Sequence, residues 1–146
     1  MMESVKQFTV GDVTYSVKQF TVGDVTYSVA RASAIDQDAI LSLLTSPITE
    51  RWAVLRQRGD VSDVESMIMP MFMAMPQSIK QPVSGMLMKK AFIAGEQSAV
   101  DIKAFSGRMV EYNTLLAKIL IWNLDDFFTW LAGVSENKEN QESQQQ

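Results

Sequence analysis

The sequence predicts a mainly helical α+β fold, in which an N-terminal β-hairpin, present in duplicate, is followed by a helical bundle of about five or six helices. Hydrophobic residues alternate with period two as far as Val29 and recur with a period near 3.6 after it. They make up 47% of a 146-residue chain, which is enough for one core. We expect residues 16–133 to form a single domain, residues 1–15 to be a looser copy of the hairpin, and residues 134–146 to be a disordered polar tail.

The hairpin prediction comes from the unit SVKQFTVGDVTY, which occurs from Ser4 to Tyr15 and again from Ser16 to Tyr27. In each copy Gly-Asp separates two alternating segments, as in a hairpin with a type II′ turn. The apolar residues that would share a face are Phe8, Val10, Val13, Tyr15 and Val17 in the first copy and Phe20, Val22, Val25, Tyr27 and Val29 in the second.

The two copies conflict if they form one continuous sheet. A single strand from Val13 to Val22 would turn the two apolar sets to opposite faces, because side chains alternate with period two. Burying both sets on one face would need a bulge or turn near Lys18. Otherwise we expect the second copy to pack on the body, and the first to be loose or to pair with a sheet edge of a neighbouring subunit.

The first predicted helix starts at Ser33, with Asp36 in its first turn. Pro47 marks either a break or the beginning of a second helix, which runs from Ile48 to Arg58 and ends at Gly59. The apolar stripe of the first helix would comprise Ile35, Ala39, Ile40, Leu43 and Leu44.

A third helix is expected from Asp60 or Ser62, with Pro70 and Pro76 disturbing it. Pro82 would lie in the linker that follows, with Ser84 as a cap. The later periodicity predicts helices over residues 85–94, 98–122 and 125–131. The core face of the long one would comprise Val100, Ile102, Phe105, Met109, Tyr112, Leu116, Ile119 and Leu120.

The composition excludes several classes of function. The chain has no cysteine and no histidine, so thiolate and imidazole metal sites and serine–histidine or cysteine–histidine nucleophile pairs are impossible. Carboxylate or lysine chemistry stays open, but the adjacent Asp125 and Asp126 do not face each other as an acid–base pair would. We expect no enzymatic activity, no cofactor and no metal.

The charge and hydropathy patterns also bear on partners and location. The net charge of −4 and the scattered basic residues argue against nucleic-acid binding. No segment carries the about 20 apolar residues that a membrane-spanning helix needs, and the N-terminus lacks the pattern of a signal peptide. We therefore expect a soluble, cytoplasmic protein that does not bind membranes.

A methionine-rich segment, MIMPMFMAMP from Met67 to Pro76, is the sharpest compositional feature. Methionine is flexible and polarisable, and it is common on surfaces that accept several apolar partners. The segment is either an adaptable binding surface or a core segment that uses methionine as filler, and methionines on all sides of a helix favour burial. The candidate client-binding or self-association residues are Met67, Met69, Met71, Phe72, Met73 and Met75.

A second motif, Trp122-Asn123-Leu124-Asp125, follows the apolar run Ile119–Ile121. Taken alone, it suits a helix end followed by a tight turn. Together with the short strand pair that leads into helices at Phe20 to Arg31 and the acidic, cysteine-free helical middle, it resembles the tail assembly chaperones of long-tailed, lambda-like bacteriophages (siphophages). The resemblance spans Phe20 to Leu131. The family motif often continues into a glycine-containing acidic turn, whereas this chain continues with residues 127–130, FFTW.

The resemblance implies a late, non-enzymatic role in virion assembly in the host cytoplasm. Such chaperones are mostly helical, form homo-oligomers, bind and solubilise the tape measure protein, and are absent from the mature virion. A longer form, made by a ribosomal frameshift, recruits the tail tube protein. The alternatives are a virion structural protein, such as a tail-completion or head–tail joining subunit, a small regulatory or host-interaction module, and an enzyme that uses carboxylates.

Overall fold

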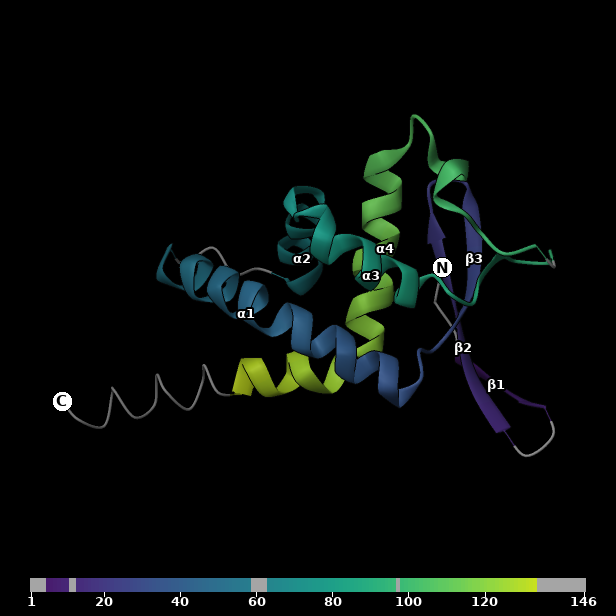
Figure 1. Ribbon diagram of the computed structural model, residues 1–146, viewed down its shortest axis with the longest axis horizontal. Helices are drawn as coiled ribbons and strands as arrows, with labels where there is room; N and C mark the ends of the chain where they lie inside the picture. The colour runs from purple at the N-terminus through teal and green to yellow at the C-terminus, as the bar shows by residue number, and fades with distance from the viewer. Residues whose placement is uncertain (1–4, 11–12, 59–62, 97, 134–146) are drawn as a thin grey trace.

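The structure, a computed structural model, describes residues 5–10, 13–58, 63–96 and 98–133, with side chains described from Ser16 onward except that of Arg58. The fold is mixed α+β and mainly helical, which confirms the predicted class. A sheet at the N-terminus is followed by helices (Figure 1). The elements in chain order are β1 (Val5–Val10), β2 (Val13–Val22), β3 (Val25–Ala30), α1 (Ala34–Arg58), α2 (Val64–Ala74), α3 (Gln77–Leu87), β4 (Ala91–Ile93), the 3-10 helix η1 (Ile102–Phe105), α4 (Met109–Asn123) and a last helix over residues 125–133.

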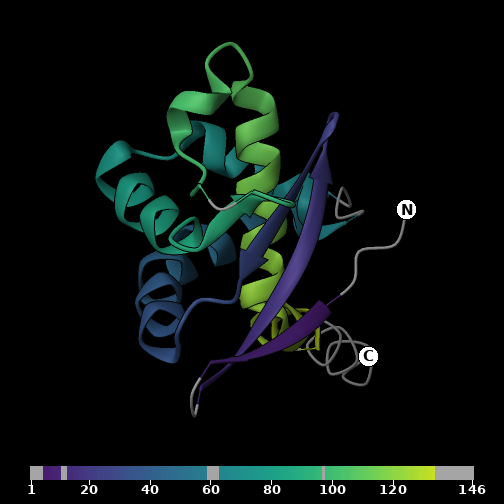
Figure 2. The ribbon, with the colours of Figure 1, turned by 90° about the vertical axis from the view of Figure 1, so that its right-hand side faces the viewer.

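The sheet is antiparallel, with the strand order β1-β2-β3-β4. Helix α4 runs between the sheet and the other helices (Figures 1 and 2). Aromatic side chains join these layers: the ring of Phe20 lies 5.8 Å from that of Trp122, and the ring of Phe105 lies 5.7 Å from Tyr27 and 5.1 Å from Tyr112. Helix α4 is therefore the centre of the core, and nine of its residues are buried.

Strand β2 continues through the junction of the two repeat copies without a bulge. Lys18 pairs with Val5 of β1 and with Val29 of β3, so the bulge or turn that burial of both sets on one face would need is absent at Lys18. Phe20 is buried against the helices, and the alternation of the strand places the half-buried Val17 on the opposite face. The two copies therefore form one continuous sheet without any change in the alternation of side chains. The first hairpin extends beyond the end of β3, because β1 pairs with residues 13–18 of β2 and β3 pairs with residues 17–22.

The turn of the second copy has the predicted geometry. Gly23 has a φ of +60°, and no non-glycine residue among those described, Asp24 included, has a positive φ. This combination distinguishes a type II′ turn from a type I′ turn, which needs two positive values. The equivalent Gly11-Asp12 turn lies outside the described residues.

Helix α1 is continuous through Pro47, so the predicted division into two helices is wrong. Its start is as predicted, because the backbone N–H of Asp36 donates to the hydroxyl of Ser33 at 3.1 Å. The interior proline costs about 3 kcal/mol. The fully buried side chains of Ile40, Leu44 and Ile48, spaced by four residues, form one stripe across the proline and offset that cost.

Two members of the predicted stripe of the first helix are on the wrong side. Ile35 and Leu43 are exposed, and the inward face is shifted to include Ile48. A stripe of five residues allowed more than one choice of inward direction, and only the packing against the other helices selects one. The predicted helix end at Gly59 lies outside the described residues.

Helix α2 begins at Val64, after Asp63. The carboxylate of Asp63 accepts a hydrogen bond from the backbone N–H of Ser66 at 2.7 Å, which makes Asp63 the N-cap. The predicted starts at Asp60 or Ser62 are therefore too early, and both residues lie outside the described part of the chain.

Among the prolines of the middle segment, Pro76 interrupts the helical run as predicted, whereas Pro70 and Pro82 do not. Pro70 lies inside α2 and Pro82 inside α3, so Pro82 is not in a linker. Only Pro76 separates two helices, as the N-cap of α3. Ser84 is not a cap either: it lies within α3, and its hydroxyl donates to the carbonyl of Gln81 at 3.2 Å.

The predicted helices over residues 85–94 and 98–122 are also wrong in part. Helix α3 ends at Leu87, and residues 91–93 form β4, which pairs with β3 from Val29↔Ala91 to Tyr27↔Ile93. Gly107, with a φ of +76°, separates η1 from α4. Of the predicted core face, Ile102 and Met109 are exposed. The last helix, expected over residues 125–131, is confirmed and reaches residue 133.

Candidate functional site

The methionine-rich segment lies on α2 and in the turn before α3, and its residues divide between core and surface. Met67, Phe72 and Met75 are buried. Met69 and Met71 are half-buried against the core, and Met73 is 48% exposed. The segment thus has an inner side that fills the core and an outer side that solvent or a partner can reach.

An apolar groove lies between α1, α2 and the start of α3. Of the candidate residues, Met71 and Met75 line it, whereas Met67, Met69, Phe72 and Met73 do not. The groove has a volume of about 520 Å³. Three of its residues are prolines, whose φ angles are fixed, and two are methionines, whose side chains adapt in shape. Rigid walls with an adjustable floor suit apolar side chains of varied shape. The lining residues are Pro47, Glu50, Arg51, Val54, Pro70, Met71, Ala74, Met75, Pro76 and Ile79.

A strip of α1 with exposed apolar residues continues from this groove. Leu43 and Val54 are both exposed and stand three helical turns apart, so they lie on the same face of α1, about 16 Å from each other. Pro47 and the charged Glu50 lie between them on nearly the same face, so the strip is not wholly apolar. The strip has the length of about three turns of a second helix laid beside α1.

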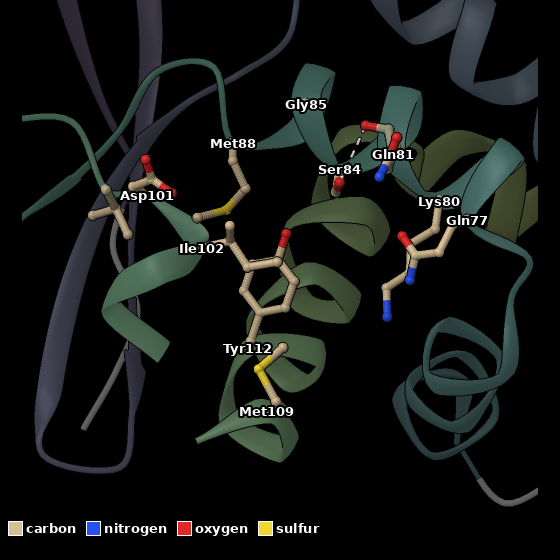
Figure 3. Close-up of a pocket in the computed structure, with 11 residues that line it drawn as sticks. Gln77, Lys80, Gln81, Ser84, Gly85, Met88, Asp101, Ile102, Met109 and Tyr112 are labelled. Carbon is tan, nitrogen blue, oxygen red and sulfur yellow. Dashed lines mark hydrogen bonds between the residues drawn. The ribbon is translucent and has the colours of Figure 1, made fainter. Parts of the chain in front are cut away.

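A second hollow, of about 420 Å³, lies between α3, α4 and the segment around η1 (Figure 3). The polar face of α3 supplies Gln77, Lys80, Gln81 and Ser84, which follow helical spacing. Figure 3 shows the hydroxyl of Tyr112 directed toward Ser84 and Met88. Burial raises the pKa of the Tyr112 phenol, although a hydrogen bond with Ser84 opposes this, so the phenol is a hydrogen-bond donor at neutral pH.

Lys80 is buried at the edge of this hollow. Its ammonium donates to the amide oxygen of Asn113, itself buried, at 2.6 Å. Burial lowers the pKa of Lys80, because the charged form loses solvation. The described residues therefore line the hollow with hydrogen-bonding groups, among them Gln77, Gln81 and Ser84.

The sequence motif at Trp122 forms a structural junction between the end of the hairpin and the end of α4. The guanidinium of Arg31 donates to the carbonyl oxygen of Trp122 at 2.9 Å and lies over the Trp122 ring at 4.8 Å. It also lies 3.7 Å from the carboxylate of Asp125. The Trp122 ring also packs edge-to-face against the ring of Phe20.

The remaining residues of the motif complete this junction. The amide oxygen of Asn123 accepts a hydrogen bond from the backbone N–H of Ala32 at 2.8 Å, and its NH₂ group donates to the carbonyl of Ile119 at 3.0 Å. Leu124 is buried and ends α4. The motif therefore holds the start of the helical body to the sheet, and it lies apart from the methionine groove.

Sequence reasoning identified the methionines of the groove but missed its α1 wall and the whole of the second hollow. The polar spacing of residues 77, 80, 81 and 84 could have indicated one wall of that hollow. No local pattern could have joined it to Tyr112, because the contact depends on the packing of α3 against α4.

Comparison with protein-family models, curated protein sequences and solved structures found no match to this chain. Within the described ranges, no group of three or more acidic residues is placed to hold a metal ion. None of the helices in those ranges is long and apolar enough to cross a membrane.

Proposed function

We propose that this protein is a non-enzymatic tail assembly chaperone of a long-tailed bacteriophage, which binds and solubilises the tape measure protein in the host cytoplasm and is absent from the mature virion. The resemblance over Phe20–Leu131 supports this proposal. The observation that carries it in the structure is the apolar groove between α1, α2 and α3, with its methionine floor.

The physical demands on such a chaperone agree with this groove. A tape measure protein exposes the apolar stripe of a long amphipathic helix until the tail tube covers it, and that stripe would otherwise aggregate. A helix-in-groove contact with an adaptable floor binds many apolar sequences without selecting one. The strip of α1 from Leu43 to Val54, which carries Glu50 among its apolar residues, extends the contact along a client helix.

The client must also be released, so the affinity of each subunit should be modest. Homo-oligomers arrayed along one client helix would raise the overall affinity through effective concentration. A longer frameshifted form would then recruit the tail tube protein to the same array.

The test is co-expression with the large helical protein of the same genome, with soluble recovery of that protein as the readout. Phe72→Ala is a poor probe, because truncating a fully buried phenylalanine costs about 3–5 kcal/mol and would unfold much of the protein. Val54→Glu is better, since Val54 lines the groove and is 41% exposed. It should leave the fold intact and reduce soluble recovery several-fold.

Val110→Glu is the matched control. It makes the same substitution at a valine that is 60% exposed, at the start of α4 and outside the groove. We expect it to behave like the unmodified protein. Equal recovery with both variants would refute the groove, and detection of the protein in purified virions by mass spectrometry would favour the structural-subunit alternative.

A further inference from the structure

The duplication presents β3 with two candidate partner strands of identical sequence. Strand β1, VKQFTV, has the same sequence as residues 17–22, the second half of β2. That half pairs with β3 from Val22↔Val25 to Val17↔Ala30. Strand β1 pairs instead with the first half of β2, whose residues 13–17 repeat the sequence of residues 25–29.

The two ladders also share one register. Phe8 faces Tyr15 in the first ladder, as Phe20 faces Tyr27 in the second, and each threonine pair follows the same rule. Every residue of β1 therefore corresponds to one residue of the segment 17–22, which pairs with β3.

The position beside β3 is the one that the core requires. Phe20 and Val22 are buried there, and Phe20 packs against Trp122. The ammonium of Lys18 lies 5.3 Å from the centre of the Phe20 ring. The first copy has phenylalanine, valine and lysine at the matching positions 8, 10 and 6. Exchange of one strand for the other would leave the chemistry of the core unchanged.

We propose that residues 5–10 and residues 17–22 are interchangeable partners of β3 within one chain. In the minor form, residues 5–10 pair with Val25–Ala30, and residues 11–24 form the connection in place of the two-residue turn at Gly23-Asp24. This form loses the outer hairpin and closes a longer loop. Loop closure depends only logarithmically on length, and an isolated hairpin adds little stability, so the minor form lies within reach of the major one.

Engineered disulfides can test the exchange, because the natural chain contains no cysteine. Thr21 and Thr26 face each other across β2 and β3, with their hydroxyls 2.9 Å apart. Thr9 is the counterpart of Thr21 in the first copy. The pair Thr9→Cys/Thr26→Cys can form a disulfide within the chain only in the exchanged register, because a disulfide needs Cα atoms within about 7 Å.

Two further pairs are controls. Thr21→Cys/Thr26→Cys reports the major register, and Thr9→Cys/Thr21→Cys joins positions that pair in neither register. Under mild oxidation of the folded, full-length protein, we expect the 9/26 pair to cross-link within the monomer at least tenfold faster than the 9/21 pair. Phe20→Ala should raise this ratio, because Phe8 then restores the core, and Phe8→Ala should lower it.

The cross-linking rates of the 9/26 and 9/21 pairs are always compared in proteins that carry the same substitution at position 8 or 20. A general loosening of the fold then affects both rates equally and does not change their ratio. Equal rates for the 9/26 and 9/21 pairs would overturn the proposal. So would identical effects of Phe20→Ala and Phe8→Ala. Cross-linking of the 9/26 pair only between chains would also overturn it and would indicate exchange between two copies instead.

Discussion

Replacing Arg31 with methionine tests whether the junction at Trp122 holds the sheet to the helical body. Methionine keeps most of the length and the apolar stem of arginine but removes the guanidinium. The variant therefore loses the hydrogen bond to the Trp122 carbonyl, the stacking on the Trp122 ring and the ion pair with Asp125.

The three contacts of Arg31 are expected to contribute unequally to the free energy of unfolding. A hydrogen bond from a charged donor contributes about 1.5–3 kcal/mol, and a cation–π contact that is partly exposed adds about 0.5–1 kcal/mol. The ion pair adds at most about 0.5 kcal/mol, because its atoms are 3.7 Å apart and the Asp125 side chain is 65% exposed. The buried Nε of Arg31 has no hydrogen-bond partner among the described residues, which subtracts about 1 kcal/mol. We expect Arg31→Met to lower the free energy of unfolding by about 2 kcal/mol.

The assay is urea unfolding followed by circular dichroism, with Asp125→Ala as the comparison. Asp125→Ala removes the ion pair and an acidic side chain from the first turn of the last helix, and it should lower the free energy of unfolding by less than about 1 kcal/mol. A loss from Asp125→Ala as large as that from Arg31→Met would show that the exposed ion pair, and not the contacts with Trp122, carries the junction. The reasoning would also be refuted if Arg31→Met had no measurable effect.

Three further predictions concern other parts of the fold. Removal of residues 4–15 gives the same protein as removal of residues 16–27. The shortened protein should fold and lose less than about 2 kcal/mol of unfolding free energy, measured with urea, because one hairpin still fills the place beside β3. A larger loss would show that both copies are integral to the fold. Lys80→Met should lower the free energy of unfolding by about 1–2 kcal/mol, because it leaves the Asn113 oxygen unpaired. Adding Asn113→Leu should recover that loss, so a double-mutant cycle in which the two effects are fully additive would contradict the prediction. The hydrogen bond from the Ser66 backbone holds the pKa of Asp63 below its usual value, so the cap stabilises α2 above the ordinary aspartate pKa and the effect is lost as the pH falls through the folded-state pKa. Asp63→Asn should abolish this part of the pH dependence of unfolding, and an unchanged profile would argue against it.

The helix boundaries show where local sequence signals were sufficient and where they failed. Ser33 and the glycine of the second turn were located correctly, because their preferences depend on backbone geometry within a few residues. Local signals place Pro47 at a break or at the beginning of a helix and Pro82 in a linker, but both lie inside helices. The cost of an interior proline is a few kcal/mol, and the burial of residues on both sides of it can exceed that cost.

In strand β4, pairing with a distant segment outweighs the local sequence preference even more clearly. Residues 91–93 are apolar and follow a helical pattern, and nothing in their local sequence demands a strand. They are extended because β3 offers an unpaired edge, whose backbone groups need partners. A contact between segments about 60 residues apart therefore decided their conformation.

The candidate site divides in the same way. The sequence alone singled out the methionine-rich segment and the motif at Trp122, since unusual composition and helix-end residues can be read directly. It did not show that Phe72 faces the core while Met73 faces outward. Nor did it show that α1 supplies the other wall of the groove.

The sequence by itself determined the class of the fold, the hairpin and its duplication, the position of the last helix, and the exclusion of thiolate and imidazole chemistry, because these follow from residue types and short-range periodicity. Only the tertiary structure decided that β2 is continuous across the two copies, that the motif at Trp122 is a junction with Arg31, and which methionines are exposed. These features depend on contacts between distant segments, and their packing energies are larger than the local preferences they override.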